Sequence, residues 1–192
     1  MLTAYFDESY NKRTFCVGGW LCADDEWTKI INRWMLRIQH ENRISRRRKL
    51  RPITRFHASD CATFGGDFRG WDQVRQVGLM KKLTEIIGRS KPIGIATSAQ
   101  LGDFVSGYPV QEKQRHRGCY FFAMIAYLLM LGDLMSEQFP NERVTIIYDR
   151  GNISERAAQK AFSSMKNDLR YEHESILWPL PQWVGKIARR SK

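Results

Sequence analysis

The chain has 192 residues, 43% of them hydrophobic, and its 31 lysines and arginines against 20 acidic residues give a formal net charge of +11. The length and apolar content predict one domain over residues 1–192. The positive charge makes nucleic acid the first partner to consider, because phosphate contacts supply most of the non-specific affinity of basic proteins for nucleic acid. An anionic membrane surface or simple solubility are the alternative explanations of the charge.

The four cysteines have no Cys-x-x-Cys spacing, so the sequence gives no support for a zinc knuckle. No stretch reaches the ~20 apolar residues of a membrane-spanning helix, and the N-terminus lacks a signal-peptide pattern. We therefore expect a cytoplasmic protein with no membrane partner.

The first predicted element is a buried strand that ends in carboxylates. An apolar, β-prone run over residues 2–6 stops at Asp7 and Glu8. Side chains alternate along a strand, so Asp7 shares a face with Tyr5 while Glu8 points the other way. A turn over residues 10–13 and a return strand over residues 15–22 would complete a hairpin.

A helix and a basic segment are expected next. Asp24 or Asp25 can cap a helix with one apolar face, formed by Trp27, Ile30, Ile31, Trp34 and Ile38. Residues 43–55 then contain seven basic residues and no acid, which predicts a basic loop that is either a solvated surface or an arm that follows phosphates. The segment has no aromatic residue to stack on bases, and its candidate phosphate ligands are Arg46, Arg47, Arg48, Lys49 and Arg51.

His57 and Asp60 stand three residues apart before a glycine-rich stretch over residues 64–71. This spacing lets the two side chains converge on one metal ion or one phosphate, although the spacing alone favours a hydrogen-bonded structural pair. A helix that stops at Gly88 should follow, because apolar residues recur at helical spacing up to that glycine.

The second half of the chain alternates between strands and helices. We expect a strand over residues 91–101, a loop, a central buried helix over 111–138 and a strand over 143–149 that ends in Asp149. A helix over 153–169, a strand over 172–178 and a basic tail over 182–192 should complete the chain. This order favours an α/β fold with a mixed sheet.

Two apolar strands each ending in an aspartate indicate a candidate metal site. If the two strands are neighbours, Asp7 and Asp149 lie side by side and repel each other unless a cation separates them. A divalent ion such as Mg²⁺ or Mn²⁺ prefers carboxylate oxygens and can support phosphoryl transfer. Strand-end aspartates also serve as helix caps and loop anchors, so a simple turn after Asp149 is the alternative.

Several short segments together resemble one protein family. They are Tyr5-Phe6-Asp7-Glu8-Ser9, Val17-Gly18-Gly19, Phe56-His57-Ala58-Ser59-Asp60, Phe68-Arg69-Gly70-Trp71 and Tyr148-Asp149, and the family is the domain of unknown function 3800. The resemblance implies a ribonuclease H-like mixed sheet of about five strands flanked by helices, with a helical insertion after the first hairpin. It also implies a pocket in which Glu8, His57 and Asp60 join Asp7 and Asp149.

The chain departs from the family pattern at two positions. Tyr10 replaces a glycine that usually follows the Asp-Glu-Ser motif, and Gly185 stands where the family commonly has a late aspartate. The leading hypothesis is a metal-dependent nuclease-like enzyme. The alternatives are a nucleic-acid-binding or assembly protein that keeps the fold but not the chemistry, and a homo-oligomer with a contact through Trp178 and Trp183.

Overall fold

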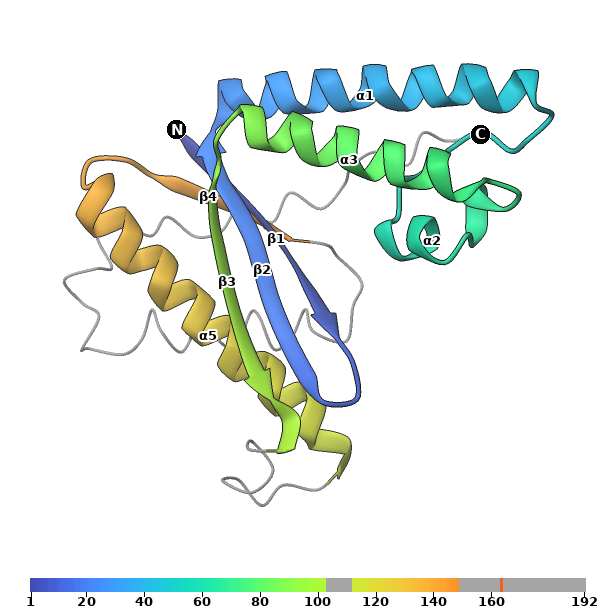
Figure 1. The fold of residues 1–192 in the computed structure, drawn as a ribbon. Helices are drawn as coiled ribbons and strands as arrows, with labels where there is room; N and C mark the ends of the chain where they lie inside the picture. Colours follow the sequence, from blue (N-terminus) through green and yellow to red (C-terminus); the bar gives the residue numbers. More distant parts are fainter. Residues whose placement is uncertain (103–111, 149–162, 164–192) are drawn as a thin grey trace. The chain divides into compact units, whose positions relative to one another are not determined.

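The computed structural model describes residues 1–102, 112–148 and 163. Figure 1 shows its elements, which in chain order are β1 (Leu2–Tyr10), β2 (Thr14–Ala23), α1 (Asp24–Arg47), α2 (Ala58–Ala62), the 3-10 helix η1 (Gly66–Phe68), α3 (Gln73–Arg89), β3 (Ile93–Gln100), α5 (Glu112–Gln138) and β4 (Val144–Tyr148). The chain forms two compact units, a sheet unit (Met1–Ala23 and Ile93–Lys192) and a helical unit (Asp24–Pro92). The expectation of a single domain stays a prediction.

The sheet has four described strands in the order β3-β2-β1-β4. β1 pairs antiparallel with β2, β2 pairs antiparallel with β3, and β1 pairs parallel with β4. The predicted α/β class with a mixed sheet is therefore confirmed. The expected strand over residues 172–178, the helix over 153–169 and the tail over 182–192 lie outside the described residues.

The β1–β2 hairpin closes through Asn11. Its side-chain Oδ1 accepts hydrogen bonds from the backbone N–H groups of Arg13 at 2.7 Å and Thr14 at 2.8 Å, which is the way Asx turns reverse a chain. Gly19 lets the two strands approach, because a Cβ at this position would lie 2.2 Å from the carbonyl oxygen of Tyr5. The predicted hairpin is confirmed.

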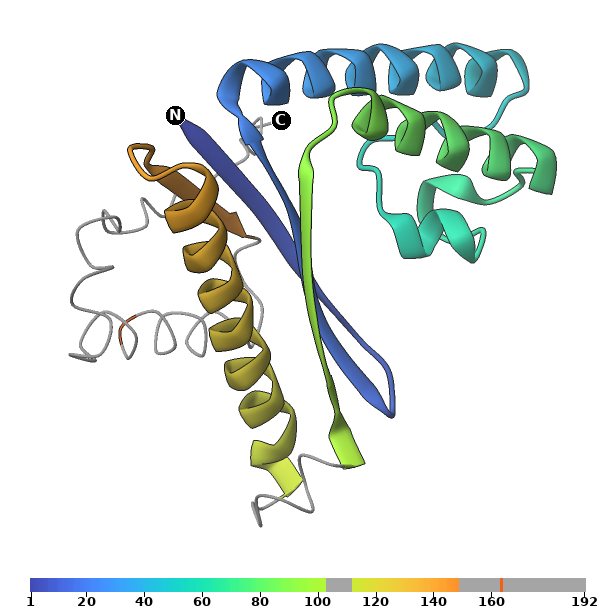
Figure 2. The ribbon, with the colours of Figure 1, turned by 60° about the vertical axis from the view of Figure 1, so that its left-hand side comes forward.

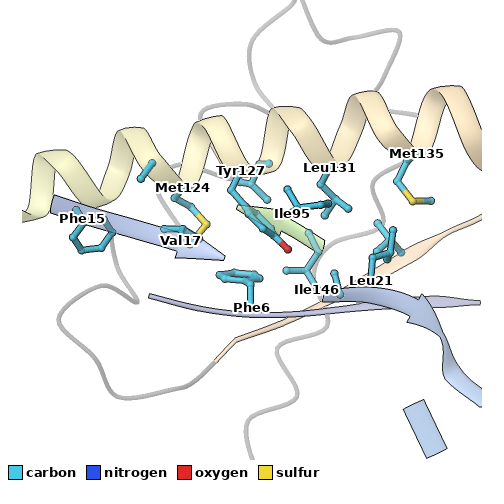
Figure 3. Packing of buried hydrophobic residues seen from close by; sticks show 14 of the residues in the cluster. Phe6, Phe15, Val17, Leu21, Ile95, Met124, Tyr127, Leu131, Met135 and Ile146 are labelled. Carbon is cyan, nitrogen blue, oxygen red and sulfur yellow. The ribbon is translucent and has the colours of Figure 1, made fainter. Parts of the chain in front are cut away.

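Helix α5 covers one face of the sheet and encloses the larger core (Figures 1, 2 and 3). The strands contribute Leu2, Ala4, Phe6, Phe15, Val17, Leu21, Ile95, Val144 and Ile146, and α5 contributes Cys119, Ala123, Met124, Tyr127, Leu128, Leu131 and Met135. Helix α5 is the helix predicted over residues 111–138, but two of its apolar side chains, Phe122 and Met130, are exposed. Among the described residues, α5 packs on the sheet through the face that carries Tyr127 and Leu131.

The helical unit lies between β2 and β3 in the chain, as the predicted insertion after the first hairpin requires. Its helices α1 and α3 lie side by side (Figures 1 and 2). Edge-to-face aromatic contacts hold its core, with ring centroids 5.4 Å apart for Trp34 and Phe56, 5.9 Å for Phe56 and Phe68, and 5.2 Å for Phe68 and Trp71.

Two expectations for α1 are wrong. Ile31 is exposed, although its spacing placed it on the apolar face. The helix also continues to Arg47, so the first five residues of the expected basic loop over 43–55 are helical. The reason is that Glu41 and Ser45, which are polar, continue the buried face set by Ile38. Among the described helices, none is long and apolar enough to cross a membrane.

Candidate functional site

Asp7 is an exposed residue inside β1 and not its last residue. The expectation that it ends the strand is wrong, because antiparallel pairing with β2 continues from Asp7↔Gly18 to Tyr10↔Phe15. On its other edge, the described pairing of β1 with β4 ends at Phe6↔Tyr148. Asp7 is thus the first residue of β1 beyond the described parallel pairs.

The carboxylate of Asp7 has small neighbours along the sheet. The register places Gly18 of β2 and then Ala96 of β3 in the row that crosses Asp7. Asp7 Oδ1 accepts a hydrogen bond of 2.9 Å from the backbone N–H of Glu8, and the described part of the chain supplies this carboxylate with no ion pair. Asp7 therefore offers an exposed oxygen donor of the kind that hard divalent cations prefer.

Glu8 lies on the opposite face of the sheet from Asp7. The alternation along β1 puts Leu2, Ala4, Phe6 and Glu8 on the face covered by α5, and Asp7 on the other. Strand β1 therefore presents one carboxylate to each face. The pocket in which Glu8 joins Asp7 stays a prediction, and it would have to reach both faces of this strand.

The second predicted ligand, Asp149, lies outside the described residues. It follows Tyr148 directly in the sequence. Within residues 1–102 and 112–148, no three or more histidine, cysteine, aspartate or glutamate side chains gather as they would around a metal ion. The donor chemistry of Asp7 fits Mg²⁺ or Mn²⁺, and the described residues supply one ligand of the predicted pair.

His57 and Asp60 belong to the helical unit, and the structure brings them together there. His57 is the N-cap residue of α2 but makes no side-chain capping hydrogen bond, and its Nδ1 lies 2.8 Å from Ser59 Oγ and 3.7 Å from Asp60 Oδ2. The Asp60 side chain also packs against Gly66, where a Cβ would lie 2.9 Å from Asp60 Oδ2. These contacts fit the structural pair at least as well as a ligand site.

The predicted phosphate-binding residues are exposed, but they are not equally available. Arg46 and Arg47 lie in the last turn of α1, and Lys49 follows the helix. None of these three residues makes an ion pair within the described chain. Arg48 Nη1 binds Asp72 Oδ2 at 3.1 Å. Arg51 acts on Asp67: burial alone would raise the pKa of Asp67, but hydrogen bonds from Thr54 and Arg55, together with the Arg51 charge, hold that pKa below its usual range.

A buried ion network in the helical unit was not predicted from the sequence. Glu41 is 1% exposed and binds Arg37, while its Oε2 accepts a hydrogen bond of 2.8 Å from Arg75 Nε. Arg75 Nη2 also donates to the Glu41 carbonyl oxygen at 2.9 Å and to Ser45 Oγ at 2.8 Å. Its guanidinium Cζ lies 3.5 Å from the centre of the Trp71 ring.

The sequence did contain a signal for this network. Glu41 is the only acid between residues 27 and 59, and Glu41 and Ser45 continue the helical spacing of Trp34 and Ile38. An acid on an apolar face, four residues after Arg37, indicates a buried ion pair.

Comparison with models of protein families, with curated proteins and with solved structures finds no match to this chain. The resemblance to the domain of unknown function 3800 stays a prediction.

Proposed function

We propose that this protein is a metal-dependent, nuclease-like hydrolase that acts on the phosphodiester bonds of nucleic acid, with Asp7 and Asp149 as ligands of Mg²⁺ or Mn²⁺. One observation carries the proposal, namely the parallel register of β1 and β4, in which Phe6 pairs with Tyr148. The next residue is an aspartate in both segments. Continued by one residue, this register would put Asp7 and Asp149 on neighbouring strands and on the same face.

The chemistry follows from the repulsion between two such carboxylates. Two negative charges at neighbouring positions need a cation between them, and oxygen donors select a hard divalent ion. An ion bound there supplies activation of water and stabilisation of the leaving oxygen in phosphoryl transfer. The role of the protein is to hold Asp7 on a rigid strand, beside small residues that leave room for a phosphate.

The charge of the chain supports a polyanionic substrate. The net charge of +11 favours phosphate-rich partners, and Arg46, Arg47 and Lys49 are exposed cations without an ion pair among the described residues. Arg48 is a weaker candidate, because Asp72 already neutralises it.

A second candidate function is nucleic-acid binding without catalysis. It is favoured by the position of Glu8, because β1 presents a single carboxylate to the face of Asp7. Gly185, in place of the acid that the family resemblance implies, favours the same alternative. On this account the ribonuclease H-like fold serves binding or assembly.

Cleavage of a mixed panel of DNA and RNA with Mg²⁺ or Mn²⁺ separates the two functions. The wild type should cleave at least one member, and Asp7→Asn should abolish cleavage without changing the fold. Asp133→Asn is the matched control, because Asp133 is an exposed aspartate on α5 in the same unit, and it should leave the rate unchanged. A wild type that binds the panel but cleaves nothing with either ion would favour the binding protein.

A further inference from the structure

The solvent face of α1 carries a line of basic residues that extends well beyond the predicted segment. Trp34, Ile38, Glu41 and Ser45 define the packed face of the helix. At about 100° per residue, seven positions of α1 fall within roughly 40° of the direction opposite Ile38, namely Asp25, Lys29, Arg33, Leu36, His40, Arg43 and Arg47. Four of these are basic residues beyond the first two turns of the helix. They are Arg33, His40, Arg43 and Arg47, all exposed, and we name them the α1 basic face.

Among the residues that the structure describes, no acid forms an ion pair with this face. The only acid of α1 after Glu26 is Glu41, which is buried and bound to Arg37 and Arg75. Asp25 falls in the same sector at the N-terminal end of the helix, where Asp25 and Glu26 bind Lys29. Within the described chain, the three arginines of the α1 basic face form no ion pair. Their charge is available to a partner.

We propose that the α1 basic face docks along the sugar-phosphate backbone of double-helical nucleic acid, independently of sequence. This inference rests on the proposed function and names its substrate class. Arg33 and Arg47 are separated by 14 residues of continuous helix, which corresponds to about 21 Å at 1.5 Å per residue. A straight, rigid row of cations of this length matches the regular phosphates of a duplex.

The same face is poorly suited to single strands and to membranes. Single-strand sites stack bases on aromatic side chains, and neither tryptophan of α1 lies on this face: Trp34 packs in the core, and Trp27 falls on the same side of the helix. A helix that lies on a membrane needs a broad apolar face. The sector of the α1 basic face contains one apolar residue, Leu36, which is 63% exposed; the other exposed apolar residues of α1, Ile31 and Met35, lie outside it.

The test is binding measured by fluorescence anisotropy in EDTA, so that cleavage plays no part. The probes are a 25-base-pair duplex, a single strand of equal length and anionic lipid vesicles, each over a range of salt. The variant is Arg33→Gln/Arg43→Gln/Arg47→Gln. Its matched control removes the same charge from exposed residues elsewhere in the helical unit, as Lys81→Gln/Arg89→Gln/Lys91→Gln.

We expect the triple variant to lose duplex affinity by about tenfold or more, with the slope of log K against log salt reduced by about 0.9 for each lost contact. The control should keep most of the affinity, and lysine in place of the three arginines should restore it, which separates lost charge from lost folding. The inference would be overturned if the triple variant bound the duplex as tightly as the control variant does. It would also be overturned if the wild type bound the single strand or the vesicles more tightly than the duplex. If the triple variant bound the duplex normally and cleavage still depended on Asp7, the α1 basic face would not be the docking surface, but the proposed function would stand.

Discussion

Lys49 occupies a position that helices usually give to glycine. Its φ is 55°, in the left-handed region, and it follows the last turn of α1. The backbone N–H of Leu50 donates to the Ser45 carbonyl oxygen at 2.8 Å, and that of Lys49 donates to Arg46 at 3.2 Å, which is the pattern of a Schellman cap. A side chain with a Cβ is strained in this conformation.

Replacing Lys49 by glycine should therefore stabilise the protein. The relief of left-handed strain, roughly 1–2 kcal/mol, exceeds the entropy that glycine loses on folding, so we expect a net gain of about 0.5–1 kcal/mol in the free energy of unfolding. Lys49→Ala is the control, because alanine keeps the Cβ but removes the charge. Equal stability of the two variants in urea denaturation would show that the backbone conformation is not the cause.

Tyr127 places a hydroxyl group in the core beneath α5, close to Phe6 and Ile146 (Figure 3). The residue is fully buried, and its ring centroid lies 5.0 Å from that of Phe6. The hydroxyl has no hydrogen-bond partner within the described residues, and burial raises the pKa of this phenol. A buried polar group without a partner opposes folding.

Tyr127→Phe should thus stabilise the protein. The change removes an unpaired hydroxyl and keeps the ring contact with Phe6, so we expect a gain of about 1 kcal/mol in the free energy of unfolding. Tyr10→Phe is the control, since Tyr10 is exposed, and it should change stability little. Loss of stability in Tyr127→Phe, measured by chemical denaturation, would mean that the hydroxyl contributes a favourable contact.

At the scale of elements, Glu41 links α1 to α3. Its carboxylate binds Arg75 of α3, whose side chain is 7% exposed. It also binds Arg37, which lies on α1 like Glu41 itself. Removal of one partner from a buried ion pair leaves an uncompensated charge in the interior. The packing of the two helices therefore depends on this carboxylate.

Glu41→Ala should destabilise the helical unit by about 3–5 kcal/mol, because Arg75 would stay buried and unpaired. The double variant Glu41→Met/Arg75→Met should recover most of that loss, since it removes both charges and fills the space. Arg37 can then turn to solvent, because its side chain is already 26% exposed. A double variant no more stable than Glu41→Ala, as measured by urea unfolding, would contradict this account.

The elements themselves could be predicted well where hydrophobic periodicity is clear. The hairpin, β3, α5 and β4 follow directly from apolar spacing in the sequence. The end of α1 could not be predicted in this way, because Glu41 and Ser45 are polar yet buried, and only their partner Arg75 of α3 explains why. The end of β1 also depends on its partner, since β2 extends the strand past Asp7.

At the scale of the whole molecule, the candidate site depends on which strands are neighbours. The sequence indicates two apolar strands followed by aspartates, but it does not determine that they pair or in which register. The structure shows that β1 and β4 are parallel neighbours, with Phe6 opposite Tyr148. The place of Asp149, and of His57 and Asp60 relative to Asp7, depends on contacts that local sequence patterns do not encode.

The most direct test of the metal site is a crystal structure grown with Mn²⁺, with the ion located by its anomalous scattering. The account predicts one ion in contact with a carboxylate oxygen of both Asp7 and Asp149. Ligand distances near 2.1 Å require these two oxygens to lie within about 4.2 Å of each other. Carboxylates of Asp7 and Asp149 that lie too far apart to share an ion would contradict it.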